Sequence, residues 1–174
     1  IAFNSIQIYN SNNKYTRIIS KSYKSVVAID VPIAPGIIGL GTGFFISSDG
    51  YILTAGHVIV PNEHKYKVHL SAAQTYNDIT SKKSIEFDAD LIAVDYFSDL
   101  AVLKINYKTP FFKFIVKDIQ IGTEVFTVGH PLSLIWSAST GIISGFNREL
   151  LPYKYDDLIQ TTTPINGGSS GSPL

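Results

Sequence analysis

Short apolar runs, rich in Val, Ile, Phe and Tyr, follow one another along most of this chain. Most are bounded by Gly, Pro, Asn, Asp or Ser, and none shows a long helical period. The runs are Ser25–Val31, Ile37–Ser47, Tyr51–Thr54, Lys67–Ala72, Asp90–Asp95, Leu100–Ile105, Glu124–Gly129, Ser139–Phe146 and Leu158–Thr161. Short strands at this spacing are typical of a β-sandwich or a β-barrel, so we predict an all-β fold.

Polar stretches separate the apolar runs. Ser48-Asp49-Gly50 is a hairpin turn signal, because glycine supplies the positive φ that such turns need. We expect a long excursion at Asn62–Phe87, a crossing between two halves of the fold at Lys104–Lys117, and a polar loop at Asn147–Asp157. Residues 1–24 are polar and mixed, and form either an arm or a short helix before the core.

The composition bounds the class of protein. The chain has 174 residues, of which 45% are hydrophobic, enough for one domain with a sizeable core. The chain has 14 basic and 14 acidic residues, and this neutral balance does not indicate binding to nucleic acid or to an anionic membrane. The chain has no cysteine and hence no disulfide or thiolate metal site. The longest apolar region, residues 26–46, is interrupted by Asp30, Pro32 and Pro35, so we expect no membrane span.

Small residues surround Ser170 in Pro164-Ile-Asn-Gly-Gly-Ser-Ser-Gly-Ser-Pro-Leu174. A nucleophilic serine needs a sharp turn, and Gly168 and Gly171 tolerate positive φ and close backbone approach. The same composition also describes a flexible linker. Because serine is a poor nucleophile without a base, the choice depends on what the rest of the chain supplies.

Histidine is the natural base near neutral pH, and the chain has four. His57 follows an apolar strand and a small Ala-Gly pair, a position from which a rigid scaffold can present it to a cleft. His64 and His69 lie among lysines and are expected at the surface. His130, before Pro131, is expected to be structural or exposed in a loop. No helical histidine pair is present, so we expect no metal site.

A carboxylate must orient the base and stabilise its charged form. Asp99 directly precedes the apolar run Leu100–Ile105. At the start of a strand a carboxylate can be held partly buried if it has a polar partner. Asp95 is the competing acid and has no comparable position. The candidates therefore occur in the order His57, Asp99, Ser170.

Three stretches together resemble trypsin-like serine proteases, and most closely the HtrA (Deg) type. Gly41–His57 is similar to the histidine segment of that family, Ser98–Ile105 to its aspartate segment, and Ile159–Leu174 to its serine segment. Val128–Pro131 and Thr140–Gly145 also resemble segments of the family. One such match is weak, but three in the family's chain order are specific.

The resemblance implies an all-β fold of two antiparallel six-stranded β-barrels with the site between them. Residues 1–24 would be an N-terminal arm before a protease domain at 25–174. The first barrel would span 25–105 and the second 111–174. The second barrel is expected to be incomplete, because similar proteins continue beyond the serine segment with closing strands.

The resemblance also implies a serine endopeptidase that acts through an acyl-enzyme, with His57, Asp99 and Ser170 as the triad. Gly168, Ser169 and Ser170 would form the oxyanion hole. Polypeptides would be the substrates, in protein quality control or processing, with no cofactor and no nucleic-acid partner. The resemblance is compatible with a homo-oligomer and favours an extracytoplasmic location, periplasmic or secreted.

For substrate binding, the family's positions map to Pro164, Ile165, Asn166 and Gly167. None carries a charge, which favours small aliphatic residues before the cut bond. The chain departs from the family at three positions: Ser169 and His130 stand where Asn is common, and Ser172 stands where Gly is usual. Two alternatives stay open, an inactive peptide-binding module of the same fold and a structural β-domain.

Overall fold

The computed structural model describes residues 14–61, 65–71, 84–114, 118–150 and 155–174. These residues form one α-helix, α1 (Lys14–Ser22), three short 3-10 turns and two antiparallel sheets. The strands are β1 (Val26–Ala34), β2 (Ile37–Phe45), β3 (Tyr51–Ala55), β4 (Lys65–Ser71), β5 (Ser84–Asp95), β6 (Leu100–Lys104), β7 (Glu124–Gly129), β8 (Ser137–Leu150) and β9 (Tyr155–Thr161). None of the described helices is long and apolar enough to cross a bilayer.

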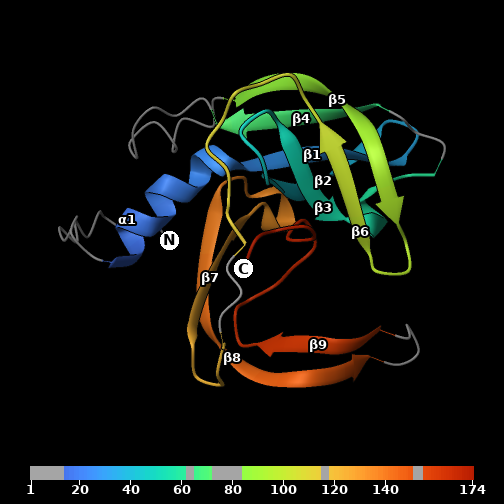
Figure 1. The fold of residues 1–174 in the computed structure, drawn as a ribbon. Coiled ribbons are helices and arrows are strands. Elements are labelled where there is room, and N and C mark those ends of the chain that lie inside the picture. Colours follow the sequence, from blue (N-terminus) through green and yellow to red (C-terminus); the bar gives the residue numbers. More distant parts are fainter. Residues whose placement is uncertain (1–13, 62–64, 72–83, 115–117, 151–154) are drawn as a thin grey trace, which may run out of the picture.

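The first six strands close into an antiparallel barrel in the order β1-β2-β3-β6-β5-β4 (Figure 1). Successive side chains of a strand point to opposite faces, so alternate residues fill the barrel. The interior holds a cluster of fully buried apolar side chains, including Val27, Ile29, Phe45, Ile52, Val68 and Leu103. The β2–β3 connection contains Gly50 at φ 97°, as the turn signal predicts. The all-β prediction and the closed six-stranded barrel are confirmed.

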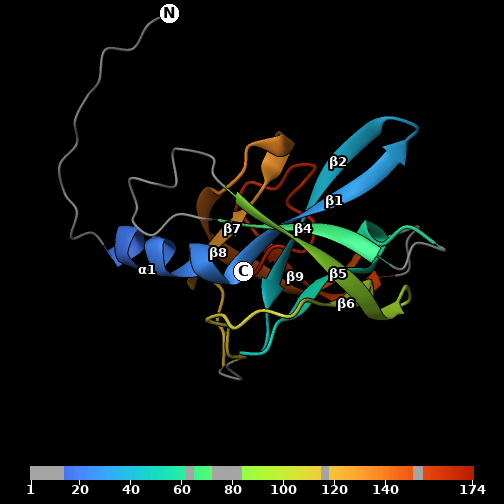
Figure 2. The same cartoon turned by 90° about the horizontal axis from the view of Figure 1, so that it is seen from above.

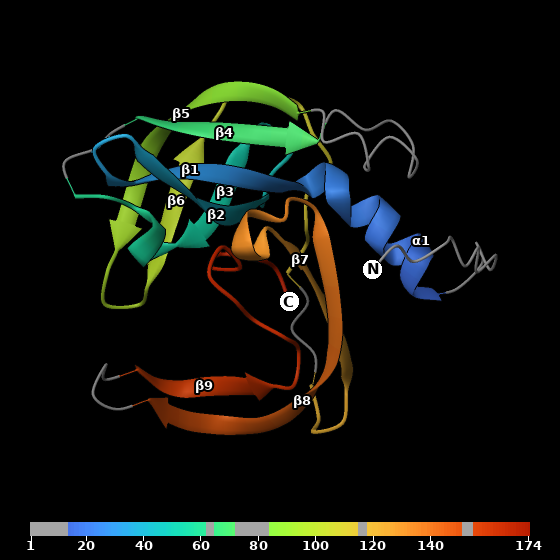
Figure 3. The same ribbon diagram turned by 180° about the vertical axis from the view of Figure 1, so that it is seen from behind.

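The second sheet has the order β7-β8-β9 and extends away from the barrel (Figures 1 and 3). A second core cluster joins this sheet to the barrel. It contains Tyr23, Val26, Val128 and Trp136. Val26 on β1 belongs to this cluster while its neighbour Val27 belongs to the barrel interior, so the first four residues of β1 are buried on both faces.

Residues 1–24 were expected to form either an arm or a short helix, and the described residues of this segment, 14–24, include helix α1. Helix α1 extends to one side of the sheets (Figure 2). Lys14 and Tyr15 both donate side-chain hydrogen bonds to Glu124 of β7, at 2.7 and 2.6 Å. The helix then leads through Tyr23 into the second core cluster.

Two stretches expected to be mainly polar connections contain more strand than predicted. Within 62–87 the predicted run Lys67–Ala72 corresponds to β4. The 62–87 stretch contains β4 and the start of β5, and the 147–157 stretch contains the end of β8 and the start of β9. On the solvent face of β4 and β5 the polar residues pair across strands: Lys67 lies 2.8 Å from Glu86 and 2.9 Å from Asp88. Opposite charges on paired strands suit an exposed sheet face, so polarity there does not indicate a loop.

We expect the loss of stability caused by a substitution on β1 to depend on how deeply the side chain is buried. Ile29→Ala should lower the free energy of unfolding by about 2–5 kcal/mol, because it opens a cavity in the barrel core. Ile33→Ala, the same change on the same strand at a side chain that is 67% exposed, should change it by about 0.5 kcal/mol or less. Urea denaturation checks both, and equal effects would contradict the core assignment.

Candidate active site

His57 and Asp99 meet because the strands that carry them pair. His57 follows β3 in a 3-10 turn (Gly56–Val58), and Asp99 immediately precedes β6. The β3–β6 ladder places Ala55 opposite Leu100. The carboxylate of Asp99 accepts hydrogen bonds from His57 Nδ1, at 2.8 and 3.0 Å, and from the backbone N–H of His57, at 2.8 Å. Because one carboxylate binds both ring and backbone, it fixes the orientation of the imidazole.

Asp95, the competing acid, shapes the turn that presents Asp99. Its carboxylate accepts a hydrogen bond from the Phe97 N–H at 2.9 Å. Hydrogen bonds from Ser98, and then from the Phe97 backbone, hold the pKa of the Asp95 carboxyl below its usual range. Asp99 itself has φ 53°, a left-handed conformation that is costly for a non-glycine residue and is maintained here by the surrounding turn.

Ser170 lies against the other side of the imidazole, with its Oγ 2.7 Å from His57 Nε2. With the ring proton on Nδ1, directed at Asp99, the lone pair on Nε2 is free to accept a hydrogen bond from the Ser170 hydroxyl. The side chain of His57 is 56% exposed and that of Asp99 is 24% exposed. The three predicted residues are thus connected in the order carboxylate, imidazole, hydroxyl.

Two consecutive tight turns expose the Ser170 side chain. The Ser169 N–H donates to the Asn166 carbonyl, and the Ser172 N–H donates to the Ser169 carbonyl, both at 2.9 Å. Gly168 and Gly171 occupy the third position of each turn at φ 95° and 83°, as a type II turn requires. A Cβ at Gly168 would overlap the His130 carbonyl oxygen, and one at Gly171 would overlap that of Thr42. The stretch is therefore a packed turn rather than a flexible linker.

Thr42 on β2 anchors this turn to the barrel, and sequence reasoning missed it. Its N–H donates to the Ser170 carbonyl at 2.8 Å, and its hydroxyl donates to the Gly168 carbonyl at 2.7 Å. The Thr54 hydroxyl donates to the Thr42 carbonyl at 2.6 Å. The available signal was its place between Gly41 and Gly43, where small neighbours permit close packing.

The N–H groups of Gly168 and Ser170 donate to no acceptor among the described residues. The Leu132 N–H donates to the Gly167 carbonyl at 2.7 Å. In a planar trans peptide the N–H and C=O point in opposite directions, so this bond sets the direction of the Gly168 N–H. Of the three predicted oxyanion donors, the Ser169 N–H instead donates to the Asn166 carbonyl, at 2.9 Å.

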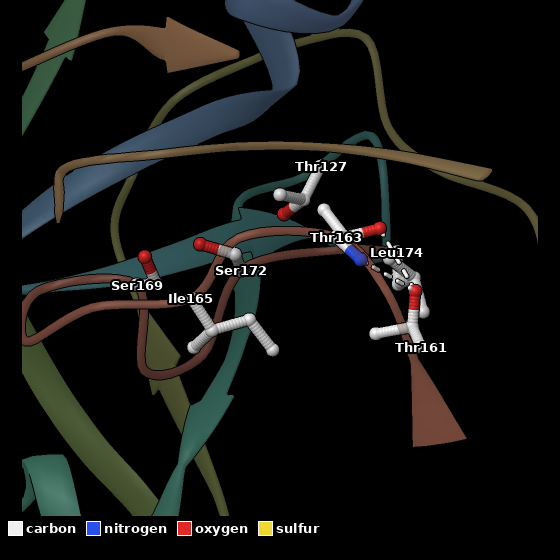
Figure 4. A pocket seen from close by; sticks show the side chains of 7 residues that line it. All are labelled: Thr127, Thr161, Thr163, Ile165, Ser169, Ser172 and Leu174. Carbon is white, nitrogen blue, oxygen red and sulfur yellow. Dashed lines mark hydrogen bonds between the residues drawn. The ribbon is translucent and has the colours of Figure 1, made fainter. Parts of the chain in front are cut away.

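A pocket of about 90 Å³ lies beside the Ser170 turn (Figure 4). Hydroxyl-bearing and aliphatic side chains line it, and none is charged. They are Thr127, Thr161, Thr163, Ile165, Ser169, Ser172 and Leu174. Of the four predicted substrate-binding residues, Ile165 lines this pocket, while Pro164, Asn166 and Gly167 lie exposed on the loop beside it.

His69 and His130, the other histidines in the described part of the chain, are both less exposed than a surface position would be. His69 was expected at the surface, but it is 21% exposed and pairs with Asp30 across β4 and β1 at 3.0 Å. His130 is 0% exposed, which agrees with the structural one of its two predicted roles and not with exposure in a loop. Burial lowers the pKa of its imidazole to about 3. His64 lies outside the described residues. Among the residues that the structure describes, no three His, Asp or Glu side chains gather as a metal site would require.

Comparison with known proteins identifies the family. The profile of the trypsin-like peptidase domain matches residues 41–174. The chain belongs to this family. It is 39% identical over 139 residues to a probable periplasmic serine endoprotease DegP-like of Bartonella henselae, covering 78% of this chain and 25% of that protein. It is 36% identical over 137 residues to the DegP-like protein of Chlamydia trachomatis, covering 77% of this chain and 25% of that protein.

Solved structures agree with this assignment. The HtrA-type protease AlgW with tripeptide superposes with a TM-score of 0.75 at 28% identity, covering 92% of this chain and 50% of AlgW. Deg5 superposes with a TM-score of 0.73 at 25% identity, covering 96% of this chain and 81% of Deg5. Within the trypsin-like peptidases, the chain is therefore of the HtrA/Deg type. It spans about a quarter of the length of the curated relatives it matches.

Burial of neutral His130 should make stability depend on pH. The pKa of His130 is near its ordinary value of 6.5 in the unfolded chain and about 3 in the folded chain. Below about pH 6.5 the unfolded chain therefore binds a proton that the folded chain does not, and stability falls as pH falls. Between pH 7 and pH 5 the free energy of unfolding should fall by about 2 kcal/mol, as measured by urea denaturation at each pH.

The matched control is His130→Asn, which cannot titrate in this range. All other ionisable groups are the same in the two proteins, so their difference in pH dependence isolates His130. The free energy of unfolding of the variant should fall less between pH 7 and pH 5. Parallel pH dependences would show that His130 is protonated in the folded protein or is not buried.

Proposed function

We propose that this chain carries the catalytic machinery of a serine endopeptidase. The observation that carries the proposal is the continuous contact from Asp99 through His57 to the Ser170 hydroxyl, at 2.8 and 2.7 Å. The same turn carries the N–H groups of Gly168 and Ser170, which donate to no acceptor in the described part of the chain. A nucleophile, an oriented base and an electrostatic site for developing negative charge together fit acyl transfer.

In this mechanism Ser170 Oγ attacks the carbonyl carbon of a peptide bond while His57 Nε2 accepts the hydroxyl proton. The carbonyl oxygen becomes an oxyanion that accepts hydrogen bonds from Gly168 and Ser170. His57 returns the proton to the leaving amine, which leaves an acyl-enzyme on Ser170. Water, activated by His57, then hydrolyses the ester. Asp99 stabilises the imidazolium in both halves and is not itself protonated.

We further propose polypeptide substrates and an extracytoplasmic site of action, in protein quality control or processing. The DegP-like relatives are named as periplasmic serine endoproteases, and the AlgW structure holds a tripeptide. The equal numbers of acidic and basic residues favour neither a nucleic-acid partner nor an anionic membrane surface.

The lining of the pocket supports a preference for small aliphatic residues before the cut bond. Ile165 contributes apolar surface, and the described side chains that line the pocket include no charged group to pair with Lys or Arg. Burial of an unpaired cation would cost several kcal/mol, whereas one methylene of misfit costs about 1–3 kcal/mol. Selectivity should therefore be broad among aliphatic residues and strong against basic ones.

Ser170→Ala in the full-length protein should abolish covalent labelling by a fluorophosphonate and leave at most about 10³–10⁴-fold acceleration over water. Ser169→Ala is the matched control, because it changes the neighbouring serine, whose hydroxyl has no contact with His57. The variant should keep most of the activity. Loss of labelling in Ser169→Ala but not in Ser170→Ala would put the nucleophile one residue earlier. A wild-type protein that does not label would favour the inactive binding module.

The specificity proposal is checked by digestion of a peptide library, with the cut sites read by mass spectrometry. Val, Ala and Ile should dominate the position before the cut bond. Ile165→Ala should admit larger aliphatic and aromatic residues there, because it removes apolar bulk from the pocket wall. A dominant preference of the wild-type protein for Arg or Lys would contradict the uncharged pocket.

A further inference from the structure

His130 is a buried histidine that the mechanism above does not use. It follows β7, and its ring packs edge-on against Trp136 with the ring centroids 4.6 Å apart. Its Nδ1 lies 3.0 Å from the hydroxyl oxygen of Thr42, the residue that anchors the Ser170 turn. Figure 3 shows this part of the chain (orange) between the barrel and the loop that carries Ser170 (red). The contact therefore links His130 to the site.

The direction of this hydrogen bond follows from the proton count. The Thr42 hydroxyl has one proton, and it donates that proton to the Gly168 carbonyl oxygen, which can only accept. The hydroxyl oxygen must then accept from His130, so Nδ1 carries the ring proton. Burial keeps the imidazole neutral, since the pKa is lowered to about 3. Nε2 is consequently unprotonated, and it has no partner among the described residues.

The tautomer of His130 with its proton on Nε2 would weaken the hydrogen bond between the Thr42 hydroxyl and the Gly168 carbonyl. An unprotonated Nδ1 would face the hydroxyl oxygen with a lone pair and would attract the hydroxyl proton away from the Gly168 carbonyl. That carbonyl would then lose its partner in a part-buried place, which costs free energy. Protonation of Nδ1 therefore favours the hydroxyl orientation that binds Gly168.

The Gly168 carbonyl matters because Gly167 and Gly168 have little intrinsic preference for one backbone conformation. Two hydrogen bonds define the conformation observed here. The Leu132 N–H holds the Gly167 carbonyl, and the Thr42 hydroxyl holds the Gly168 carbonyl, both at 2.7 Å. These two carbonyls belong to the peptide groups on either side of the Gly168 Cα. The Leu132 bond orients the peptide group that contains the Gly168 N–H, and the Thr42 bond holds the next peptide group. Together they restrict rotation about φ and ψ of Gly168, so that its N–H keeps this direction.

We propose that His130 is a positioning residue of the oxyanion hole, whose Nδ1–H orients the Thr42 hydroxyl so that it anchors the Gly168 carbonyl. This inference rests on the proposed function and deepens it. His130 touches neither the nucleophile nor the base directly. Its removal should therefore lower the rate of the chemical step and leave substrate binding nearly unchanged.

The test compares two substitutions at residue 130 in the full-length protein. His130→Asn places an amide N–H near the position of Nδ1–H, whereas His130→Leu fills similar space without a donor. His130→Leu should lower kcat about 10- to 100-fold on a fluorogenic peptide with Val before the cut bond, with KM within about threefold. His130→Asn should restore most of kcat. His69→Gln, at a histidine paired with Asp30, is the control and should leave kcat unchanged.

Two outcomes would overturn the inference: a kcat of His130→Leu equal to wild type, or a His130→Asn variant that folds but is as slow as His130→Leu. If His130→Leu does not fold, Thr42→Val and Thr42→Ser repeat the comparison, and only Thr42→Ser should retain kcat. A ring ¹⁵N NMR spectrum tests the tautomer without any activity, and a proton on Nε2 instead of Nδ1 would overturn the inference. Absence of fluorophosphonate labelling in the wild-type protein would instead count against the proposed function.

Discussion

The hydrogen bond from the Thr42 N–H to the Ser170 carbonyl joins the two parts of the candidate site. His57 and Asp99 lie on the closed barrel, whereas Ser170 lies on the loop after β9. A single hydrogen bond adds only about 1 kcal/mol to stability, but an unpaired buried partner would cost about 1–3 kcal/mol. The contact therefore acts mainly on geometry. It holds the Ser170 backbone against β2, and the distance of 2.7 Å between Ser170 Oγ and His57 Nε2 depends on that position.

The features that the sequence predicted are the local ones. Apolar runs bounded by turn residues located the strands, because burial of one strand face leaves a short-range pattern. Glycines marked the turns around Ser170, since positive φ and close backbone approach need them there. The sequence supplied His57, Asp99 and Ser170 as candidates, but the inference that they meet in one site depended on the family resemblance. The β3–β6 ladder and the loop after β9 that bring them together are long-range features.

The features that the sequence did not predict depend on contacts between distant segments. Leu132 has φ 52° and donates to Gly167, yet a leucine carries no sequence signal for a left-handed conformation. Burial of His130 follows from its packing against Trp136 and Thr42. The first half of β5 was missed because its charged residues Glu86 and Asp88 pair with Lys67 of β4 across the exposed face, and composition alone does not distinguish such a face from a loop.

The start of β1 is buried on both faces, and this burial helps to set the position of Ser170. Val27 and Ile29 face the barrel, while Val26 faces the second core cluster. A slip of β1 by one residue would exchange these faces and spoil both cores at once, so the register is strongly specified. In that register Ala28 lies opposite Thr42. The packing of the two hydrophobic cores thus fixes the position of Thr42 along the barrel. Because Thr42 binds the Ser170 backbone, it also fixes the position of Ser170.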